Sequence, residues 1–177
     1  MKNKIEKIFT LPLKMVYSKI NSVGYAKKIG VNVSGDLKIY GSSYSMFGTE
    51  PWLITLGDNV HITDGVKFIT HDGGTLILRH KMPDIEITKQ ITIGSNVYIG
   101  VNVVILPGVN IGDNCIVGAG SIVTKDIPSN SVYAGVPARF IKSLDDYFEK
   151  IKSESLHIGH LPAKEKEIAL KKHFGLN

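Results

Sequence analysis

The sequence predicts an all-β solenoid in which short parallel strands wind around a three-sided core, with helical segments at both ends. Three observations support this fold class. An aliphatic residue recurs every six positions over residues 93–128. Glycine, at 18 of 177 residues, directly follows that aliphatic residue in four of the six units. The chain is 43% hydrophobic but only 8% aromatic, so we expect a core of Ile, Val and Leu.

The six-residue repeat always begins with Ile or Val, at Ile93, Ile99, Ile105, Ile111, Val117 and Val123. The same register recurs upstream at Leu56, Ile62 and Phe68, with a trace at Ile29. A period of six fits neither the 3.6-residue period of a helix nor the alternation of a half-buried strand. It fits a short strand followed by a tight corner at Gly or Asn. Three such sides close one coil, so residues eighteen apart should stack in an inner column, which an ordinary antiparallel sandwich would not require.

The first 22 residues are predicted to form an N-terminal helical segment, in which Pro12 is expected to break or kink the helix. Its apolar residues fall largely on one face: Ile5, Ile8, Phe9, Leu13, Val16, Tyr17 and Ile20. Because the segment is basic and amphipathic, two roles are open. It could cover the first coil or a neighbouring subunit, or it could make peripheral contact with an anionic membrane.

The β-helix domain is predicted over residues 23–141, and residues 142–177 are predicted to form a C-terminal helical cap. One helix should begin near Ser143, and another should follow Pro162 and stop at Gly175. The second carries Glu167 and Lys171 at the spacing of a helical ion pair. We expect these helices to cover the last coil and to contact other subunits.

The stretch Ile116-Val-Gly-Ala-Gly-Ser-Ile-Val-Thr-Lys-Asp-Ile-Pro, followed by Ala134-Gly-Val-Pro-Ala-Arg139, resembles the terminal coil of hexapeptide-repeat sugar O-acetyltransferases. The resemblance covers residues 54–141, and within this family the sequence is similar to the maltose and galactoside O-acetyltransferases. It implies a left-handed parallel β-helix, a homotrimer with sites shared between subunits, and acetyl-CoA as co-substrate with no metal required. It also implies direct acetyl transfer to a sugar hydroxyl.

The acceptor class is indicated by two short segments, Thr49-Glu-Pro-Trp and His71-Asp-Gly-Gly. They look most like segments of surface-polysaccharide O-acetyltransferases, which implies a role in capsular polysaccharide or lipopolysaccharide biosynthesis. A small free sugar or a streptogramin-type antibiotic is an alternative acceptor, because acceptor choice lies in variable loops. A non-catalytic trimeric solenoid scaffold is the alternative from another functional class.

The repeat is interrupted once, between Phe68 and Ile91, where we expect a protruding loop at about residues 70–90. The loop opens with His71, and a histidine can accept a proton from a hydroxyl that attacks a carbonyl. The resemblance places the catalytic histidine at His71. A general-base histidine needs an acceptor on its other ring nitrogen, and the candidates are Glu50, Asp72, Asp84 and Glu86.

The resemblance also implies which residues bind acetyl-CoA and which bind the acceptor. The cofactor-binding positions are Gly100, Ala119, Thr124, Lys125, Arg139 and Lys142, of which Lys125 and Arg139 would meet phosphate. Gly100 is also expected to stabilise an oxyanion through its backbone N–H, which makes it a catalytic position. The acceptor pocket is expected to include Glu50, Trp52 and Tyr98.

Charge and cysteine content exclude several classes. The net charge is +5, but the lysines are spread over both ends without an arginine-rich stripe, so no nucleic-acid partner is expected. The single cysteine, Cys115, excludes an internal disulfide and fits a cytoplasmic protein. It occupies a small inward position of its repeat, so we expect it in the core rather than as a nucleophile. The remaining histidines lack the spacing of a metal site.

Overall fold

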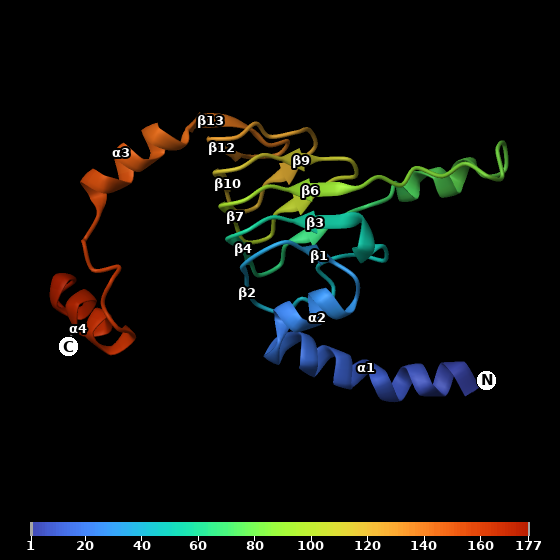
Figure 1. The fold of residues 1–177 in the computed structure, drawn as a ribbon, viewed down its shortest axis with the longest axis horizontal. Helices are drawn as coiled ribbons and strands as arrows, with labels where there is room; N and C mark the ends of the chain where they lie inside the picture. Colours follow the sequence, from blue (N-terminus) through green and yellow to red (C-terminus); the bar gives the residue numbers. More distant parts are fainter. Residues whose placement is uncertain (1, 177) are drawn as a thin grey trace. The chain divides into compact units, whose positions relative to one another are not determined.

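The computed structural model describes residues 2–176, and for residues 2–10 it describes the backbone alone. The chain forms two compact units, Met1–Leu144 and Asp145–Asn177. The first unit contains the solenoid, whose strands are stacked coil on coil in Figure 1. This arrangement confirms the predicted repeat architecture of short parallel strands.

Three sheets form the sides of the solenoid. Side 1 contains β1 (Asn32–Val33), β3 (Ile54–Leu56), β6 (Ile91–Ile93) and β9 (Asn110–Ile111). Side 2 contains β2 (Leu37–Tyr40), β4 (Val60–Thr63), β7 (Val97–Ile99), β10 (Cys115–Val117), β12 (Ser131–Ala134) and β13 (Arg139–Ser143). Side 3 contains β5 (Lys67–Phe68), β8 (Val104–Ile105) and β11 (Ile122–Val123). All strand pairs are parallel except β12 with β13, so the chain visits each side once per coil.

The strand register confirms the predicted inner column. Ile93 pairs with Ile111, eighteen residues later. All nine residues at the first position of the repeat are at most 2% exposed: Leu56, Ile62, Phe68, Ile93, Ile99, Ile105, Ile111, Val117 and Val123. The aliphatic residues therefore fill the inside of the three-sided coil, as their period requires.

The corner between sides 1 and 2 is formed by asparagine. Asn59, Asn96, Asn114 and Asn130 adopt left-handed backbone conformations, with φ between 51° and 61°. The Nδ2 group of each donates to Oδ1 of the next, at 2.9, 2.9 and 3.0 Å. Asparagine tolerates this conformation better than most residues with a side chain, so it makes the tight turn and also links successive coils.

Two helices precede the solenoid, α1 (Lys2–Ile20) and α2 (Ser22–Lys28). Of the two outcomes predicted for Pro12, a break is wrong, because α1 continues through it, and a kink stays a prediction. The predicted boundary between the N-terminal helical segment and the β-helix domain, after residue 22, falls inside α2. The repeat pattern does not reveal this second helix. The Asn21 side chain starts α2 by accepting a hydrogen bond from the Gly24 amide at 2.9 Å, which is an ordinary N-cap.

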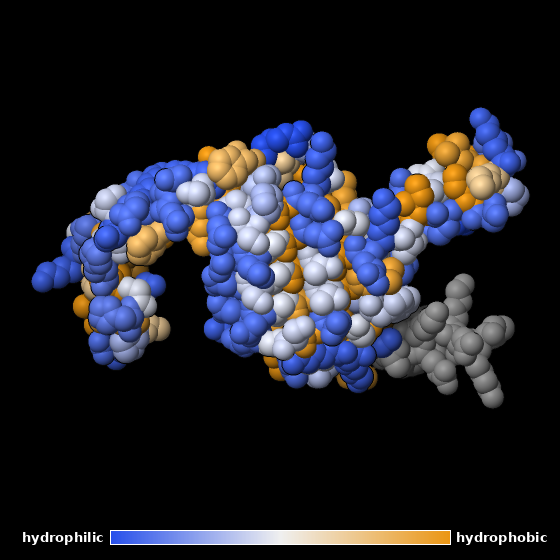
Figure 2. All heavy atoms as spheres, turned by 45° about the horizontal axis from the view of Figure 1, so that its top comes forward, coloured by the Kyte–Doolittle hydropathy of each residue, from blue (hydrophilic) through white to orange (hydrophobic). Residues whose placement is uncertain are grey.

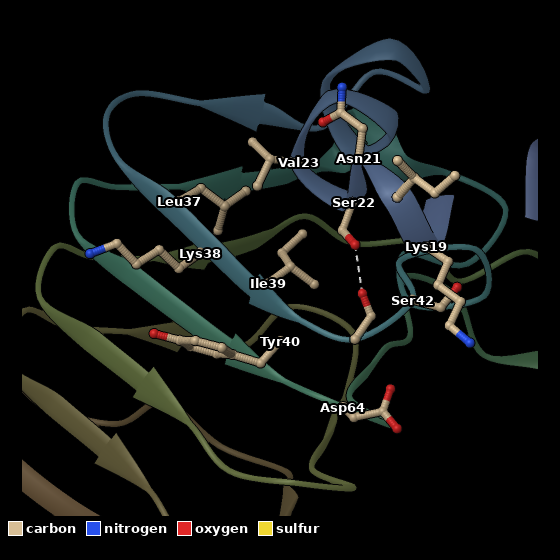
Figure 3. A pocket seen from close by; sticks show the side chains of 12 residues that line it. Lys19, Asn21, Ser22, Val23, Leu37, Lys38, Ile39, Tyr40, Ser42 and Asp64 are labelled. Atoms are coloured by element: carbon tan, nitrogen blue, oxygen red, sulfur yellow. Dashed lines mark hydrogen bonds between the residues drawn. The ribbon is translucent and has the colours of Figure 1, made fainter. Parts of the chain in front are cut away.

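The helices are fixed to the first coil by small hydroxyl side chains. Ser22 Oγ donates to the Gly41 carbonyl at 2.5 Å, a bond drawn dashed in Figure 3. The Ser18 and Ser42 hydroxyls lie 3.1 Å apart. Beside these contacts a hollow of about 890 Å³ remains between the end of α1, α2 and β2. Lys19 and Lys38 extend from opposite sides of it in Figure 3.

The interruption of the repeat is a long loop between β5 and β6, which extends away from the coils in Figure 1. Leu56 pairs with Ile93, 37 positions later, so the loop lengthens this coil by 19 residues over the usual eighteen. The loop contains the short 3₁₀ helix η2 (Gly73–Leu78). Figure 2 shows hydrophobic side chains on its surface, and Leu76, Ile77 and Met82 are all more than half exposed.

The helix α3 (Leu144–Glu154) begins at the last residue of the first unit, and the rest of it belongs to the second unit, which also contains α4 (Ala163–His173). Both helices were expected from their boundary residues. The expected helical pair is present in α4, where Lys171 Nζ lies 3.1 Å from Glu167 Oε1. None of the described helices is both long enough and apolar enough to span a bilayer.

Candidate active site

His71 lies at the root of the long loop, three residues after β5. Its backbone forms an antiparallel bridge with Thr88. On either side, the Asp72 amide donates to Ile87 O at 2.9 Å and the Lys89 amide donates to Thr70 O at 2.8 Å. The two ends of the loop are thereby tied together, so the imidazole is held by the rigid part of the loop. Its side chain is 40% exposed, which leaves one edge of the ring accessible.

Glu50 is the partner of His71. It precedes the 3₁₀ helix η1 (Pro51–Leu53), and its Oε2 atom lies 2.9 Å from His71 Nδ1. The same oxygen accepts a hydrogen bond from Thr70 Oγ1 at 2.6 Å, and Oε1 accepts one from Thr49 Oγ1 at 2.6 Å. The carboxylate is therefore held in one orientation by three donors.

These contacts shift the titration of both groups. The pKa of Glu50 is lowered from 4.5 to about 2, mainly by the hydrogen bonds from Thr49 and Thr70 and further by His71. The pKa of His71 is raised, first by its hydrogen bond to Glu50 and then by the negative charge of that carboxylate. An ionised carboxylate can only accept, so Nδ1 carries the proton and Nε2 of neutral His71 has a free lone pair. The geometry therefore suits a general base.

The other three carboxylates considered for this role have different partners or positions. Asp72 accepts a hydrogen bond from the Gly74 amide at 2.8 Å and so caps η2. Glu86 pairs with Arg79 at 2.7 Å and accepts the Thr88 hydroxyl at 2.9 Å. Asp84 lies exposed in the outer part of the loop. Of the four candidates, the structure brings Glu50 alone into hydrogen-bond contact with the imidazole.

Two hollows adjoin His71. One, of about 210 Å³, is bordered by Glu50 and by the Arg79–Glu86 pair. The other, of about 510 Å³, is bordered by Thr124, one of the predicted cofactor residues. Lys89 borders the second hollow too, and sequence reasoning missed it because it lies inside the insertion, where no repeat register applies.

The six predicted cofactor residues lie in three places on the protomer. Gly100 directly follows β7 and Ala119 follows β10, so both lie at the corner between sides 2 and 3. Thr124 and Lys125 follow β11 at the next corner, while Arg139 and Lys142 belong to β13. One protomer therefore does not gather all six around His71. The Gly100 amide donates to Val117 O at 2.8 Å, so that N–H is already used between coils and we do not assign an oxyanion to it.

The predicted acceptor residues are likewise divided. Trp52 lies two residues from Glu50 in η1 and is 63% exposed. Tyr98 lies on side 2, in register with His61, and borders a separate hollow with the buried Cys115. Burial raises the pKa of the Cys115 thiol, which disfavours the nucleophilic thiolate and agrees with its expected place in the core.

Comparison with known proteins finds matches both to the repeat alone and to most of the chain. A family model described as the hexapeptide repeat of succinyl-transferase matches residues 90–125. Protein CapG of Staphylococcus aureus is 48% identical over 151 residues, which cover 85% of this chain and 88% of that protein. Galactoside O-acetyltransferase of Escherichia coli is 43% identical over 119 residues. That match covers 64% of this chain and 58% of the relative's length.

Among solved structures, a hexapeptide-repeat-containing acetyltransferase from Vibrio cholerae superposes with a TM-score of 0.52. The superposition covers 81% of this chain and 93% of that chain, at 23% sequence identity. At this identity the likeness concerns the fold alone. It extends the match from the repeat to most of the chain.

Proposed function

Because this chain belongs to the hexapeptide-repeat acetyltransferase family, we propose that it transfers an acetyl group from acetyl-CoA to a sugar hydroxyl. The observation that carries the proposal is the hydrogen bond between His71 Nδ1 and Glu50 Oε2, which leaves Nε2 as a base. The acetyltransferase named for galactosides among its relatives supports a sugar as the acceptor. We infer the left-handed winding of the solenoid from the same membership.

The proposed reaction is a direct transfer. His71 Nε2 takes the proton of the acceptor hydroxyl as its oxygen bonds to the thioester carbonyl carbon. The C–S bond then breaks, and the proton passes from the imidazolium to the departing thiolate. Glu50 orients the ring throughout and stabilises the imidazolium by its charge. The products are an acetyl ester and free CoA.

The proposed cofactor groove is shared between subunits of a homotrimer. Thr124 adjoins the His71 hollow, whereas Gly100 and Ala119 lie at another corner of the same protomer. A groove that uses both groups requires a second subunit to supply one of them. Lys125, Arg139 and Lys142 are the cations proposed for the phosphates of CoA, with Lys125 and Arg139 as the principal pair.

For the acceptor we propose a precursor of capsular polysaccharide or lipopolysaccharide. The support is the segment from Thr49 to Trp52, which carries the orienting carboxylate and an exposed indole close to it in sequence. Exposed aromatic rings suit the apolar faces of sugar rings. A cytoplasmic site of action is part of the proposal, because acetyl-CoA is the donor.

The decisive experiment replaces His71 by alanine and measures acetyl transfer to a panel of hydroxyl compounds. The panel contains polysaccharide precursors, free galactosides and maltose, and a streptogramin. We expect kcat to fall about 10²- to 10⁴-fold, the usual contribution of a general base. The matched control is His80→Ala, because His80 lies on the same loop but bonds only to the Ile77 carbonyl, at 2.8 Å. Its activity should be unchanged.

Unchanged turnover by a folded His71→Ala protein would refute the assigned base. If no compound in the panel is acetylated and calorimetry detects no binding of CoA, the non-catalytic scaffold replaces the enzyme. Charge reversal at Arg139 separates these cases, because it weakens CoA binding only if the cation meets phosphate.

A further inference from the structure

The positive charge of this protein is concentrated at its N-terminal end. Residues 1–28 contain seven lysines and one acidic residue, Glu6. The first 28 residues thus carry a net charge of +6, and the rest of the chain, with fourteen basic and fifteen acidic residues, carries −1. After Glu6 the next carboxylate in the sequence is Asp36. The lysines with described side chains here are Lys14, Lys19, Lys27 and Lys28, and all four are exposed.

Large apolar side chains are exposed on the same segment. Leu13, Val16 and Ile20 are 71%, 56% and 80% exposed, and their spacing of three and four residues puts them on one face of α1. We call these three residues the α1 stripe. Leu11 and Met15, on the side of the helix that carries Ser18, are about half exposed. A helix packed on a protein core would bury such residues.

The opposite face of α1 is the one that contacts the rest of the unit. Ser18 is fully buried on this face, and its hydroxyl lies 3.1 Å from the Ser42 hydroxyl. At the edge of the stripe, the Tyr17 ring meets the Tyr25 ring edge-on at 6.3 Å, and Leu13 borders a hollow with both rings. These contacts fix how the helix is rotated, so the stripe faces away from the coil. Ile20 and Lys19 border the open hollow beside β2, which leaves this end of the stripe uncovered. The unit therefore presents the stripe to a partner.

We propose that the α1 stripe docks the protein on a bilayer that contains anionic lipids. A helix with an apolar face between lysines lies in the interface with its apolar side chains among the acyl chains and its ammonium groups at the headgroups. Lys14 and Lys19 flank the stripe, and Lys27 and Lys28 extend the basic surface along α2. A second copy of the chain is disfavoured as the occupant, because two such segments would bring lysines together without a carboxylate between them.

The test uses the full-length protein and vesicles of phosphatidylcholine, with or without phosphatidylglycerol, in a flotation assay. We expect binding to the anionic vesicles, weakened at least tenfold when the three stripe residues are changed together, as Leu13→Ser, Val16→Ser and Ile20→Ser. The matched control changes three exposed apolar residues of the second unit, as Ile151→Ser, Ile168→Ser and Phe174→Ser, and should bind like the wild type. Replacing Lys14 and Lys19 by glutamine should weaken binding and reduce its dependence on salt.

Three results would overturn the proposal. The first is no binding of the wild type to anionic vesicles, and the second is full binding by the folded stripe variant. The third is a stripe variant that changes oligomeric state in light scattering, which would make a second copy the occupant. The proposal does not rest on acetyl transfer, since it predicts that a folded His71→Ala protein binds vesicles like the wild type.

Discussion

The coils and the long loop use the same residue types in opposite ways. In the coils, Ile99 is fully buried on β7, and its strand pairs with β4 on one side and β10 on the other. In the loop, Ile77 is 77% exposed. The coils obtain their stability from a repeated inner column, whereas the loop is tied mainly at its root around His71. Stability and chemistry are therefore carried by different segments, and the loop can vary without disturbing the coils.

The largest expected difference is in folding energy. Ile99→Ala removes a fully buried side chain from the inner column, so we expect the free energy of unfolding to fall by about 2–5 kcal/mol. Ile77→Ala is the matched change in the loop and should alter it by less than about 0.5 kcal/mol. Urea unfolding of both variants makes the comparison. A large loss in Ile77→Ala would show instead that the loop packs against another subunit.

The second prediction concerns the carboxylate that orients the catalytic histidine. Glu50→Gln should lower kcat by roughly tenfold to a hundredfold, in line with the loss of an orienting partner of a functional histidine. His71 must be neutral to act as a base. Because Glu50 raises the pKa of His71 above 6.5, the imidazole of the wild type becomes protonated, and activity falls, while the pH is still above 6.5. Without the charge of Glu50, this acidic limb of the profile of kcat/KM against pH should move to lower pH.

The control for that profile is Glu86→Gln. Glu86 raises the pKa of His71 less than Glu50 does, and its side chain bonds to Arg79 and Thr88 instead. We expect a much smaller shift of the acidic limb. An equal shift in the two variants would contradict the assignment of Glu50 as the orienting group.

The third prediction compares two glycines. Gly65 turns the corner between β4 and β5 with φ of +75°, and a Cβ there would collide with Oδ1 of Asn102. We expect Gly65→Ala to cost about 1–2 kcal/mol of unfolding free energy. Gly73, in the loop, has no atom within 4 Å of an added Cβ. Thermal unfolding of Gly73→Ala should therefore match the wild type, and similar losses in both variants would mean that the loop is as constrained as the coils.

The smallest effect is on the pH dependence of stability. The pKa of Glu50 is depressed, so its contribution is present above pH 4.5 and is lost as pH falls toward about 2. The pKa of His71 is raised, so its contribution is complete below pH 6.5 and is lost as pH rises through the raised pKa. Wild type and Glu50→Gln should therefore differ most between about pH 4.5 and 6.5. The difference in the free energy of unfolding should stay below about 1 kcal/mol, because solvent screens partly exposed groups. Urea unfolding of both proteins at pH 3, 5.5 and 8 measures it.

The repeat, its register and the position of its interruption could all be predicted from the order of the residues. A period of six residues allows only one way to bury every aliphatic residue, so the pairing of Ile93 with Ile111 could be read directly. The terminal helices could be predicted from local signals, although Pro12 failed as a stop signal, because α1 continues through it. The departure from the repeat located the loop, and the family resemblance assigned the catalytic role within it to His71.

Only the tertiary structure decided which carboxylate meets His71. Glu50 is 21 residues away in sequence and lies outside the repeat, so no period relates the two, whereas Asp72 is adjacent and caps η2 instead. Only the structure shows that four of the predicted cofactor residues lie at two different corners of the protomer and that Arg139 and Lys142 lie on β13. It also decided which face of α1 is open, since the amphipathic pattern does not say whether a helix meets protein or lipid. The physical reason is that contacts within the coils recur at a fixed period in the sequence, whereas the site joins Glu50 and His71, whose separation in sequence follows no period.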